Sequence, residues 1–262
     1  MNKIVAIPAL KDNYIWGIYS PARSQKSEII VVDPGEANPV LAYLKQNNLG
    51  LDAVLITHHH WDHTAGLDKL KQYFPNLRIY GPKNDNIPLV THPVEQDDEI
   101  YFEVLNLTFK VLEIPGHTLD HVAYFGYQSL FCGDTLFSCG CGKLFEGSPE
   151  QMFSSLEKIK NLPSDTLIYC GHEYTLANLA FAQVVDPDNP NLQKRLSISK
   201  EMRSYNKPTL PVSLEEELKT NPFLRCAEPA IIQAVQAHQN LLSTDPVNIF
   251  AALRTWKNNF AA

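Results

Sequence analysis

The chain contains the sequence Leu55-Ile56-Thr57-His58-His59-His60-Trp61-Asp62-His63. Four histidines and one aspartate occupy six positions directly after the apolar run at 53–56. That run predicts a short buried strand, so the histidines are expected where a strand ends and a loop begins, which is where layered α/β proteins usually build their sites. Side chains alternate along an extended segment, so we expect His58 and His60 to point the same way and His59 to point elsewhere.

The residues after this strand are of the types that bind metal ions. Asp62 and His63 come just before a predicted helix at about 67–74 and can supply a second set of ligands beside the first. Neutral imidazoles and a carboxylate suit zinc, iron or manganese. The alternative is a histidine-rich surface tract, but such a tract is low in complexity and lacks a preceding strand. The stretch therefore predicts a metal site, with His59 in a supporting role.

Size and composition limit the class of protein. At 262 residues the chain is long enough for one large domain, or for one medium and one small domain. The net charge of −7 argues against a general nucleic-acid surface, which is normally basic. It does not exclude a small anionic substrate, because the local charge can oppose the global balance.

The cysteines and the apolar runs bear on the compartment. Five cysteines without paired spacing predict small buried thiols in a reducing compartment: Cys132, Cys139, Cys141, Cys170 and Cys226. The apolar stretch at 1–8 is too short for a signal peptide, and no segment approaches the ~20 apolar residues that span a bilayer. We expect a cytoplasmic protein that does not bind membranes and is a monomer.

Turn residues and periodicity predict two sets of strands flanked by helices. The first set is expected at 3–7, 14–19 and 28–32 as a β-meander, then at 53–56 and 78–80, with helices at 39–46 and up to 74. The second set is expected at 100–102, 107–113, 121–126, 129–131 and 166–170, with a helix at 151–159. Residues 81–98, rich in Pro, Asn and Asp, are predicted to form a surface excursion. This pattern predicts an α/β fold, a four-layer αββα sandwich.

The pattern of predicted secondary structure changes near residue 172. From Tyr174 onward the sequence predicts no strand, only helical stretches broken by prolines. We therefore expect a catalytic domain at 1–172 and a smaller α-helical domain at 173–262.

Three more polar residues follow predicted strands, and a glycine precedes each of them. They are Gly116-His117, Gly133-Asp134 and Gly171-His172. Glycine suits tight turns that bring the backbone close to a metal centre. Each pair alone is weak evidence, because Gly-His and Gly-Asp are common in loops. Their shared position after a strand, together with the histidine-rich stretch, indicates one constellation.

These residues resemble the metallo-β-lactamase superfamily, whose Thr-His-x-His-x-Asp-His motif is intact at 57–63. The resemblance implies two divalent metal ions, most simply zinc, with iron or manganese as alternatives. It implies that one ion is held by His58, His60 and His117, the other by Asp62, His63 and His172, and that Asp134 bridges both. Two such ions share a hydroxide that attacks a carbonyl, which makes Asp134 and Asp62 the catalytic residues.

The leaving group narrows the reaction. An amide nitrogen must be protonated before it departs, whereas a thiolate with a parent pKa near 8.5 leaves unaided. The motifs contain no obvious dedicated acid, so a thioester is chemically suitable, although this argument is permissive.

A closer resemblance, to the glyoxalase II (hydroxyacylglutathione hydrolase) family, runs through nearly the whole chain. It rests on Cys141-Gly142-Lys143, on His172-Glu173-Tyr174-Thr175, on Thr220-Asn221-Pro222-Phe223-Leu224-Arg225 and on Arg254-Thr255-Trp256-Lys257. It implies hydrolysis of S-(2-hydroxyacyl)glutathione thioesters, chiefly S-D-lactoylglutathione to D-lactate and glutathione, the second step of methylglyoxal detoxification. It implies that the substrate is bound by Lys143, Tyr174, Arg254 and Lys257. Many relatives have tyrosine where this chain has Phe145.

Periodicity alone leaves the role of the basic pair open. Arg254 and Lys257 are three residues apart, so on a helix they share a face and either grip one carboxylate or are simply solvated. The resemblance favours the carboxylate.

Other functions on this fold make different demands. A glutathione persulfide dioxygenase resembles a mononuclear iron protein that does not need Asp62, His63 and His172, and these residues are present here. A β-lactamase would lack the helical tail, and an RNA-processing nuclease would need a basic surface. A non-catalytic module would be expected to have lost ligands.

Overall fold

A computed structural model describes residues 2–21, 27–84 and 86–260. Residue contacts divide the chain into two compact units. The N-terminal unit comprises Met1–Glu113 and Asp120–Gly133, and the C-terminal unit comprises Ile114–Leu119 and Asp134–Ala262. The chain therefore enters the C-terminal unit for a short turn before it returns to complete the N-terminal one. The predicted domain boundary after residue 172 marks a change in sequence texture and stays a prediction.

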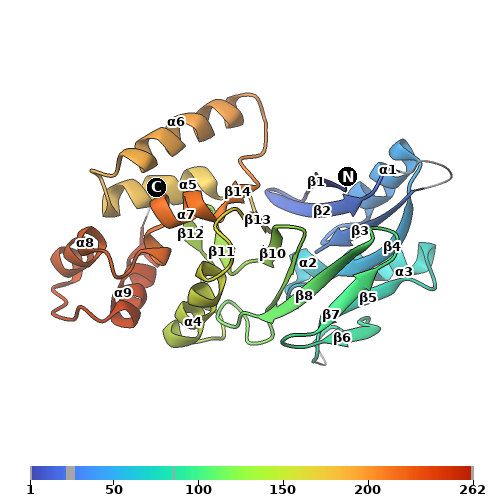
Figure 1. The fold of residues 1–262 in the computed structure, drawn as a ribbon, viewed down its shortest axis with the longest axis horizontal. Coiled ribbons are helices and arrows are strands. Elements are labelled where there is room, and N and C mark those ends of the chain that lie inside the picture. Colours follow the sequence, from blue (N-terminus) through green and yellow to red (C-terminus); the bar gives the residue numbers. More distant parts are fainter. Residues whose placement is uncertain (1, 22–26, 85, 261–262) are drawn as a thin grey trace. The chain divides into compact units, whose positions relative to one another are not determined.

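The first sheet of the N-terminal unit has the strand order β1-β2-β3-β4-β5-β6 (Figure 1). The strands are β1 (Lys3–Ala9), β2 (Asn13–Tyr19), β3 (Glu28–Val32), β4 (Gly50–Leu55), β5 (Arg78–Pro82) and β6 (His92–Val94). Strands β1 to β3 pair antiparallel, which confirms the predicted meander, and β3 to β6 pair parallel. The carboxyl ends of the parallel strands share one edge, where β4 runs into the histidine-rich stretch.

Helices cover one face of this sheet. They are α1 (Ala37–Asn47), the short α2 (Trp61–Thr64) and α3 (Leu67–Tyr73). Val40 and Leu70 belong to one buried apolar cluster with Val31 and Val54 of the sheet. Because strand side chains alternate, the neighbouring buried residues, such as Leu55, point to the opposite face. Both faces are therefore covered, and strands β3 and β4 read as continuous apolar runs.

A second set of strands packs on that opposite face. Antiparallel strands β7 (Glu99–Phe102), β8 (Leu107–Glu113), β9 (Val122–Gly126) and β10 (Ser129–Gly133) follow one another in order. The Phe102 ring meets Tyr80 of β5 edge-on at 5.4 Å, and the Tyr124 hydroxyl donates to the carbonyl of Ile56 at 2.8 Å. Three of the predicted layers, helix, sheet and sheet, thus lie within the N-terminal unit.

The prediction of a surface excursion at 81–98 is wrong in part. Strand β6 extends the first sheet, and Ile87 is buried in the same apolar cluster as the strands. The few apolar residues of this polar segment anchor it, and Asp85 lies outside the described residues.

The C-terminal unit is mainly helical (Figure 1). Its elements are β11 (Leu136–Phe137), β12 (Gly140–Cys141), α4 (Pro149–Lys160), β13 (Leu167–Cys170), α5 (Thr175–Val185), α6 (Pro190–Ser204), β14 (Val212–Ser213), α7 (Leu214–Thr220), the 3₁₀ helix η1 (Pro222–Leu224), α8 (Pro229–Gln239) and α9 (Pro246–Asn258). The predicted absence of strands after Tyr174 is wrong, because Val212 pairs with Ile168 as β14 joins β13. No helix among the described residues is both long and apolar enough to cross a membrane.

Prolines begin these helices and do not interrupt them. Pro149, Pro190, Pro229 and Pro246 occupy the first turns of α4, α6, α8 and α9. A proline there costs nothing, because the first amide of a helix has no intrahelical acceptor and the φ angle is already suitable. The proline pattern predicted breaks between helices correctly, but not that Pro190, Pro229 and Pro246 lie inside the first turn of the next helix.

Candidate metal centre

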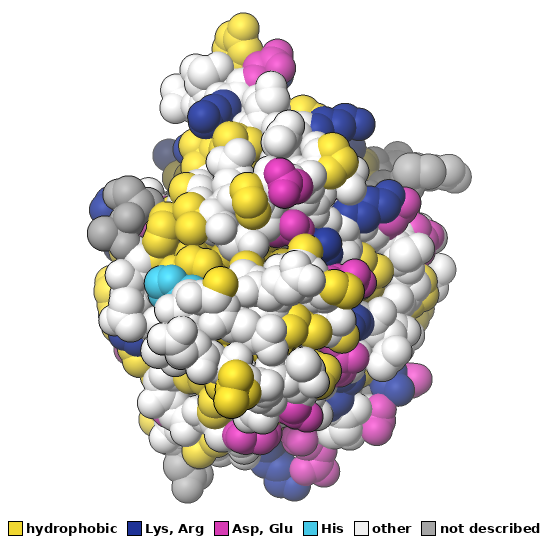
Figure 2. Space-filling view, turned by 90° about the vertical axis from the view of Figure 1, so that its left-hand side faces the viewer, with side chains coloured by type: hydrophobic (Ala, Val, Ile, Leu, Met, Phe, Trp, Pro, Cys, Tyr) yellow, Lys and Arg dark blue, Asp and Glu magenta, His cyan; other side chains and the backbone are white. Residues whose placement is uncertain are grey.

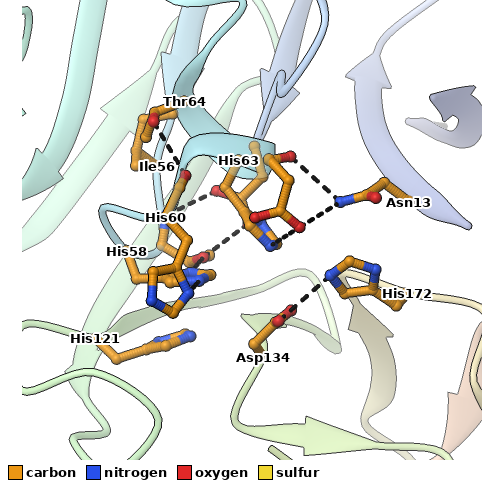
Figure 3. A network of polar contacts seen from close by, with 12 residues as sticks. Asn13, Ile56, His58, His60, His63, Thr64, His121, Asp134 and His172 are labelled. Atoms are coloured by element: carbon orange, nitrogen blue, oxygen red, sulfur yellow. Dashed lines mark hydrogen bonds and ion pairs between the residues drawn. The ribbon is translucent and has the colours of Figure 1, made fainter. Parts of the chain in front are cut away.

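The loop between β4 and α2 carries the first pair of candidate ligands. His58 is fully buried and His60 is partly buried, and Nε2 of His58 lies 3.2 Å from Nδ1 of His60 (Figure 3). The two rings meet nearly edge-on, with centroids 4.8 Å apart. The prediction that His58 and His60 converge is confirmed.

Asp33 orients the second ligand pair, and the sequence analysis did not find it. The Asp33 carboxylate accepts hydrogen bonds from the amide and hydroxyl of Thr57, at 2.8 and 2.7 Å. It lies 3.0 Å from Nδ1 of His63, which presents Nε2 toward Asp62 at an Nε2–Oδ2 distance of 3.6 Å. A carboxylate behind a histidine is the arrangement that fixes the ring of a metal ligand and raises its basicity. The signal that was available, Asp33-Pro34-Gly35 at a strand end, predicts only a turn.

Asn13 orients the carboxylate of Asp62. The Asn13 amide nitrogen donates to Oδ2 of Asp62 at 3.1 Å and to its backbone carbonyl at 3.2 Å (Figure 3). Asn13 is the first residue of β2 and is buried, so it reaches the loop from a neighbouring strand. Nothing in the sequence around Asn13 distinguishes it from a turn residue.

The remaining histidines lie as expected outside the ligand pairs. His59 turns away, with Nδ1 2.9 Å from the Asp120 carboxylate, which also accepts from Asn84 at 2.6 Å. His121 is buried and stacks on His58 with centroids 4.6 Å apart. His92 and His238 are exposed.

The C-terminal unit holds the other three candidate ligands around one carboxylate. Oδ2 of Asp134 lies 3.6 Å from Nε2 of His117 and 3.3 Å from Nε2 of His172, and the contact to His172 is drawn in Figure 3. Nδ1 of His117 donates to the carbonyl of Lys143 at 2.8 Å. All three side chains are buried. The glycine before His117 and the glycine before Asp134 have positive φ, at 151° and 45°, as the turn argument requires.

The spacing of these atoms fits metal coordination. Metal–nitrogen bonds of 2.0–2.1 Å in tetrahedral geometry place two ligand atoms about 3.3 Å apart. The four donor-to-donor distances named above range from 3.2 to 3.6 Å. At 3.6 Å a direct hydrogen bond is no longer formed. Each unit therefore contains a group of candidate ligands with such spacings: the pairs His58–His60 and Asp62–His63 in one, and Asp134 with His117 and with His172 in the other.

The predicted substrate residues all lie in the C-terminal unit. Tyr174 stacks on His172 with centroids 4.7 Å apart, and its exposed fraction of 36% leaves it accessible. The Lys143 ammonium is exposed and lies 5.2 Å above the ring of Phe145. Phe145 in turn meets His117 edge-on at 5.2 Å. Tyr174 and Lys143 are thus each linked through a ring to a candidate metal ligand.

Arg254 and Lys257 are the two basic residues of α9. The Arg254 guanidinium is buried and donates to the carbonyl of Cys141 at 2.8 Å. The Lys257 ammonium donates to the carbonyl of Ala177 at 3.0 Å. Burial, and then repulsion from Arg254, lowers the pKa of Lys257 to about 8. Both cations donate to backbone carbonyls. Within the described part of the chain, neither forms a salt bridge with a carboxylate. Their positive charge is therefore available to an incoming anion.

Comparisons with known proteins cover the whole chain. The family model "Metallo-beta-lactamase superfamily" matches residues 23–172, and the model "Hydroxyacylglutathione hydrolase C-terminus" matches residues 173–260. Proteins named hydroxyacylglutathione hydrolase from Nitrosomonas eutropha and Vibrio cholerae are 52% and 51% identical over 260 residues, which is 99% of this chain and 100% of each relative. The crystal structure of ETHE1 from Myxococcus xanthus aligns over 98% of both chains with a TM-score of 0.64 and 23% identity, a likeness of fold alone. These matches confirm the predicted α/β fold class with a helical C-terminal part.

Proposed function

The chain belongs to the hydroxyacylglutathione hydrolases of the metallo-β-lactamase superfamily, and on that premise we propose the substrate and the site of its thioester hydrolase activity. The substrate is an S-(2-hydroxyacyl)glutathione, chiefly S-D-lactoylglutathione, and the products are D-lactate and glutathione. The reaction is the second step of methylglyoxal detoxification. The observation that carries the proposal is the pairing of two complete ligand groups with a basic, unneutralised pair on α9.

The proposed centre joins the two ligand groups. It holds two divalent ions, zinc in the first place and iron or manganese as alternatives. One ion binds His58, His60 and His117, the other binds Asp62, His63 and His172, and Asp134 serves both. Bound metal supplies an activated water and a positive charge for the carbonyl oxygen. The ligand-like spacing within each group supports this assignment.

The residues of the chain divide the remaining work. Asn13 and Asp33 hold Asp62 and His63 in place, and the carbonyl of Lys143 orients His117. Arg254, Lys257 and Lys143 attract the glycine carboxylate of the tripeptide, and Tyr174 contacts its backbone. The departing thiolate needs no proton donor at neutral pH.

The second candidate is a glutathione persulfide dioxygenase with a mononuclear iron. The fold likeness to ETHE1 is compatible with it, but that reaction does not need the ligands Asp62, His63 and His172. Their retention, with Asn13 and Asp33 behind two of them, supports the hydrolase.

The deciding experiment uses protein whose metal content has been measured. S-D-lactoylglutathione is offered, and D-lactate and free thiol are quantified beside oxygen uptake with glutathione persulfide. We expect stoichiometric D-lactate and thiol, about two metal ions per chain and no oxygen uptake. Oxygen uptake with a single iron per chain would establish the dioxygenase instead. Arg254→Ala is expected to raise KM with little change in kcat, because it removes binding common to ground and transition states.

We further propose a cytoplasmic monomer that binds neither nucleic acid nor membranes. All five cysteines are buried, as expected of small structural thiols in a reducing compartment. On the face drawn in Figure 2, acidic and basic side chains are interspersed among apolar ones, so the described residues form no continuous basic field there. Light scattering on a sizing column tests the monomer.

A further inference from the structure

The hairpin β11–β12 adjoins or contacts five proposed functional residues of the C-terminal unit: Asp134, Lys143, His172, Tyr174 and Arg254. It begins two residues after Asp134 and ends two residues before Lys143. The Phe137 ring lies against both His172 and Tyr174, with centroids 5.9 and 5.2 Å apart. At its other end, the Cys141 carbonyl accepts from Arg254. A change in the turn of this short hairpin would therefore shift the substrate residues that contact it, Tyr174 beside Phe137 and Arg254 at Cys141.

The hairpin cannot hold its own shape. Its two strands have two residues each, and Cys139 in its turn has a φ of 55°, a conformation that is uncommon for a residue other than glycine. A two-stranded hairpin this short is not stable alone, so its geometry has to be imposed from outside.

The side chain of Glu217 in α7 accepts two hydrogen bonds from the turn of the hairpin. One carboxylate oxygen accepts the Ser138 hydroxyl at 2.9 Å, and the other accepts the Cys139 amide at 2.8 Å. The same oxygen accepts the side-chain amide of Asn221 at 2.9 Å. Asn221 also donates to the carbonyls of Phe137 and Gly140, at 3.2 and 2.9 Å. Glu217 and Asn221 are both fully buried.

Two other helices hold the same turn. Asn178 of α5 donates to the carbonyl of Ser138 at 3.1 Å. Arg195 of α6 donates to the Ser138 hydroxyl oxygen at 3.3 Å and to the carbonyl of Thr209 at 2.9 Å. Asn178 and Arg195 therefore bind the turn through directional hydrogen bonds. Apolar contacts alone would not fix the orientation of the turn in the same way.

Burial of the Glu217 carboxyl group costs free energy because the group loses its contact with water. This cost indicates that the carboxyl group has a specific role in the unit. Burial raises its pKa to about 7, although the hydrogen bonds from Asn221, Cys139 and Ser138 oppose that rise. Buried ionisable groups add little stability in general and are often replaceable by apolar ones. The carboxylate at this position accepts hydrogen bonds from three donors, Ser138, Cys139 and Asn221, which an apolar side chain could not do.

We propose that Glu217 is a positioning residue that sets the β11–β12 hairpin, and through it Lys143, Tyr174 and Arg254, in the geometry that binds the glutathione part of the substrate. This inference rests on the proposed function. It adds a specificity determinant that touches neither metal nor substrate and acts from α7.

The test compares Glu217→Gln with Glu215→Gln. Both replace one carboxyl group of α7 by an amide, but Glu215 is exposed and pairs with Lys219. Each variant is assayed with S-D-lactoylglutathione and with an acyl thioester of N-acetylcysteamine, which has the thioester but lacks the tripeptide. We expect Glu217→Gln to raise KM for the glutathione conjugate about tenfold, because small displacements of binding groups are costly. Metal content and turnover of the short thioester stay at the wild-type level, and Glu215→Gln behaves as wild type throughout.

The outcomes separate this inference from the proposed function. If wild-type protein hydrolyses the conjugate and Glu217→Gln matches it in KM, the positioning role is wrong and the function stands. If wild-type protein does not hydrolyse the conjugate, the function fails first. An equal loss on both thioesters, or a loss of metal, would show a merely structural role. Should Glu217→Gln not fold, Asn178→Ala, which removes one donor to Ser138, must raise KM for the conjugate alone or the inference is overturned.

Discussion

The two ligand groups are built in contrasting ways. In the N-terminal unit, four candidate ligands lie within six consecutive residues, and two side chains from preceding strands orient them. In the C-terminal unit, three candidate ligands are spread from His117 to His172, and Oδ2 of Asp134 lies within 3.6 Å of both histidines. The first group is specified locally, and the second group exists only if distant segments pack correctly.

This contrast predicts where the centre is sensitive. A group on one loop tolerates weakening of a single support, because the backbone keeps its members close. A dispersed group has no such safeguard, so loss of the side chain that its members share should abolish it.

The largest effect is expected from Asp134→Ala. Nε2 of His117 and Nε2 of His172 both face Oδ2 of Asp134, at 3.6 and 3.3 Å. Removing it should lower kcat/KM by at least about 10³-fold, because metal binding contributes several kcal/mol of transition-state stabilisation. Metal content, measured by elemental analysis, should fall at the same time. The control Asp188→Ala removes an exposed carboxylate of the same unit and should retain both. Full metal content in Asp134→Ala would contradict its role as a shared ligand.

A smaller effect is expected from Asp33→Asn in the N-terminal unit. Asparagine keeps the shape but removes the charge that orients His63, and such a change behind a ligand typically costs 10–100-fold in metal affinity. Competition with a chelator measures the change. Asp52→Asn is the matched control, because Asp52 pairs with Arg78 away from the loop. If Asp33→Asn lost as much metal as Asp134→Ala, the proposed robustness of the local group would be wrong.

The same contrast explains what could be predicted from the sequence. The candidate ligands could be predicted from the sequence, because strand ends followed by His and Asp are a chemical signal that needs no knowledge of packing. Asp33 and Asn13 were missed, because turn residues and supporting residues have the same local composition. Asp33 and Asn13 reach the ligands because β2 pairs with β3 and β3 pairs with β4. These pairings form only when the chain folds.

The elements missed in the C-terminal unit have a related cause. Strands β11, β12 and β14 have two residues each, too few for a period of two to be read. Glu217 lies among three consecutive glutamates on α7, which reads as a solvated charged face. Only burial separates Glu217 from its neighbours, and burial is a property of the packed unit.

The third prediction concerns the effect of pH on Lys257, one of the two basic residues of α9. The pKa of Lys257 is lowered to about 8, so the folded protein loses this proton at lower pH than the unfolded chain, whose lysine keeps it to about 10.5. Between these values deprotonation relieves a buried charge and adds stability, but it removes the attraction for the substrate carboxylate. We expect kcat/KM to fall roughly fivefold as pH rises through 8, the value of one modest ion pair.

Lys257→Arg is the control for that profile. Arginine stays protonated throughout the range, so the fall above pH 8 should disappear. If wild-type protein and Lys257→Arg decline together, another group causes the loss and Lys257 does not bind the carboxylate.

The smallest effect is expected at the exposed ring of Phe145. Phe145 is 60% exposed, meets His117 edge-on and lies under the Lys143 ammonium. Phe145→Tyr adds a hydroxyl beside the proposed substrate contacts without disturbing these packing partners, and one added hydrogen bond is worth about 0.5–1.5 kcal/mol. Because the site is open to water, the lower end of that range applies, and KM for S-D-lactoylglutathione should fall by about twofold while kcat is unchanged. Phe145→Leu removes the ring and its contact with Lys143, so KM should rise instead. Because Phe145 touches His117 but belongs to no ligand group, metal content should be the same in all three proteins, and a change in it would mean that the loop after Lys143 positions the metal more than the substrate.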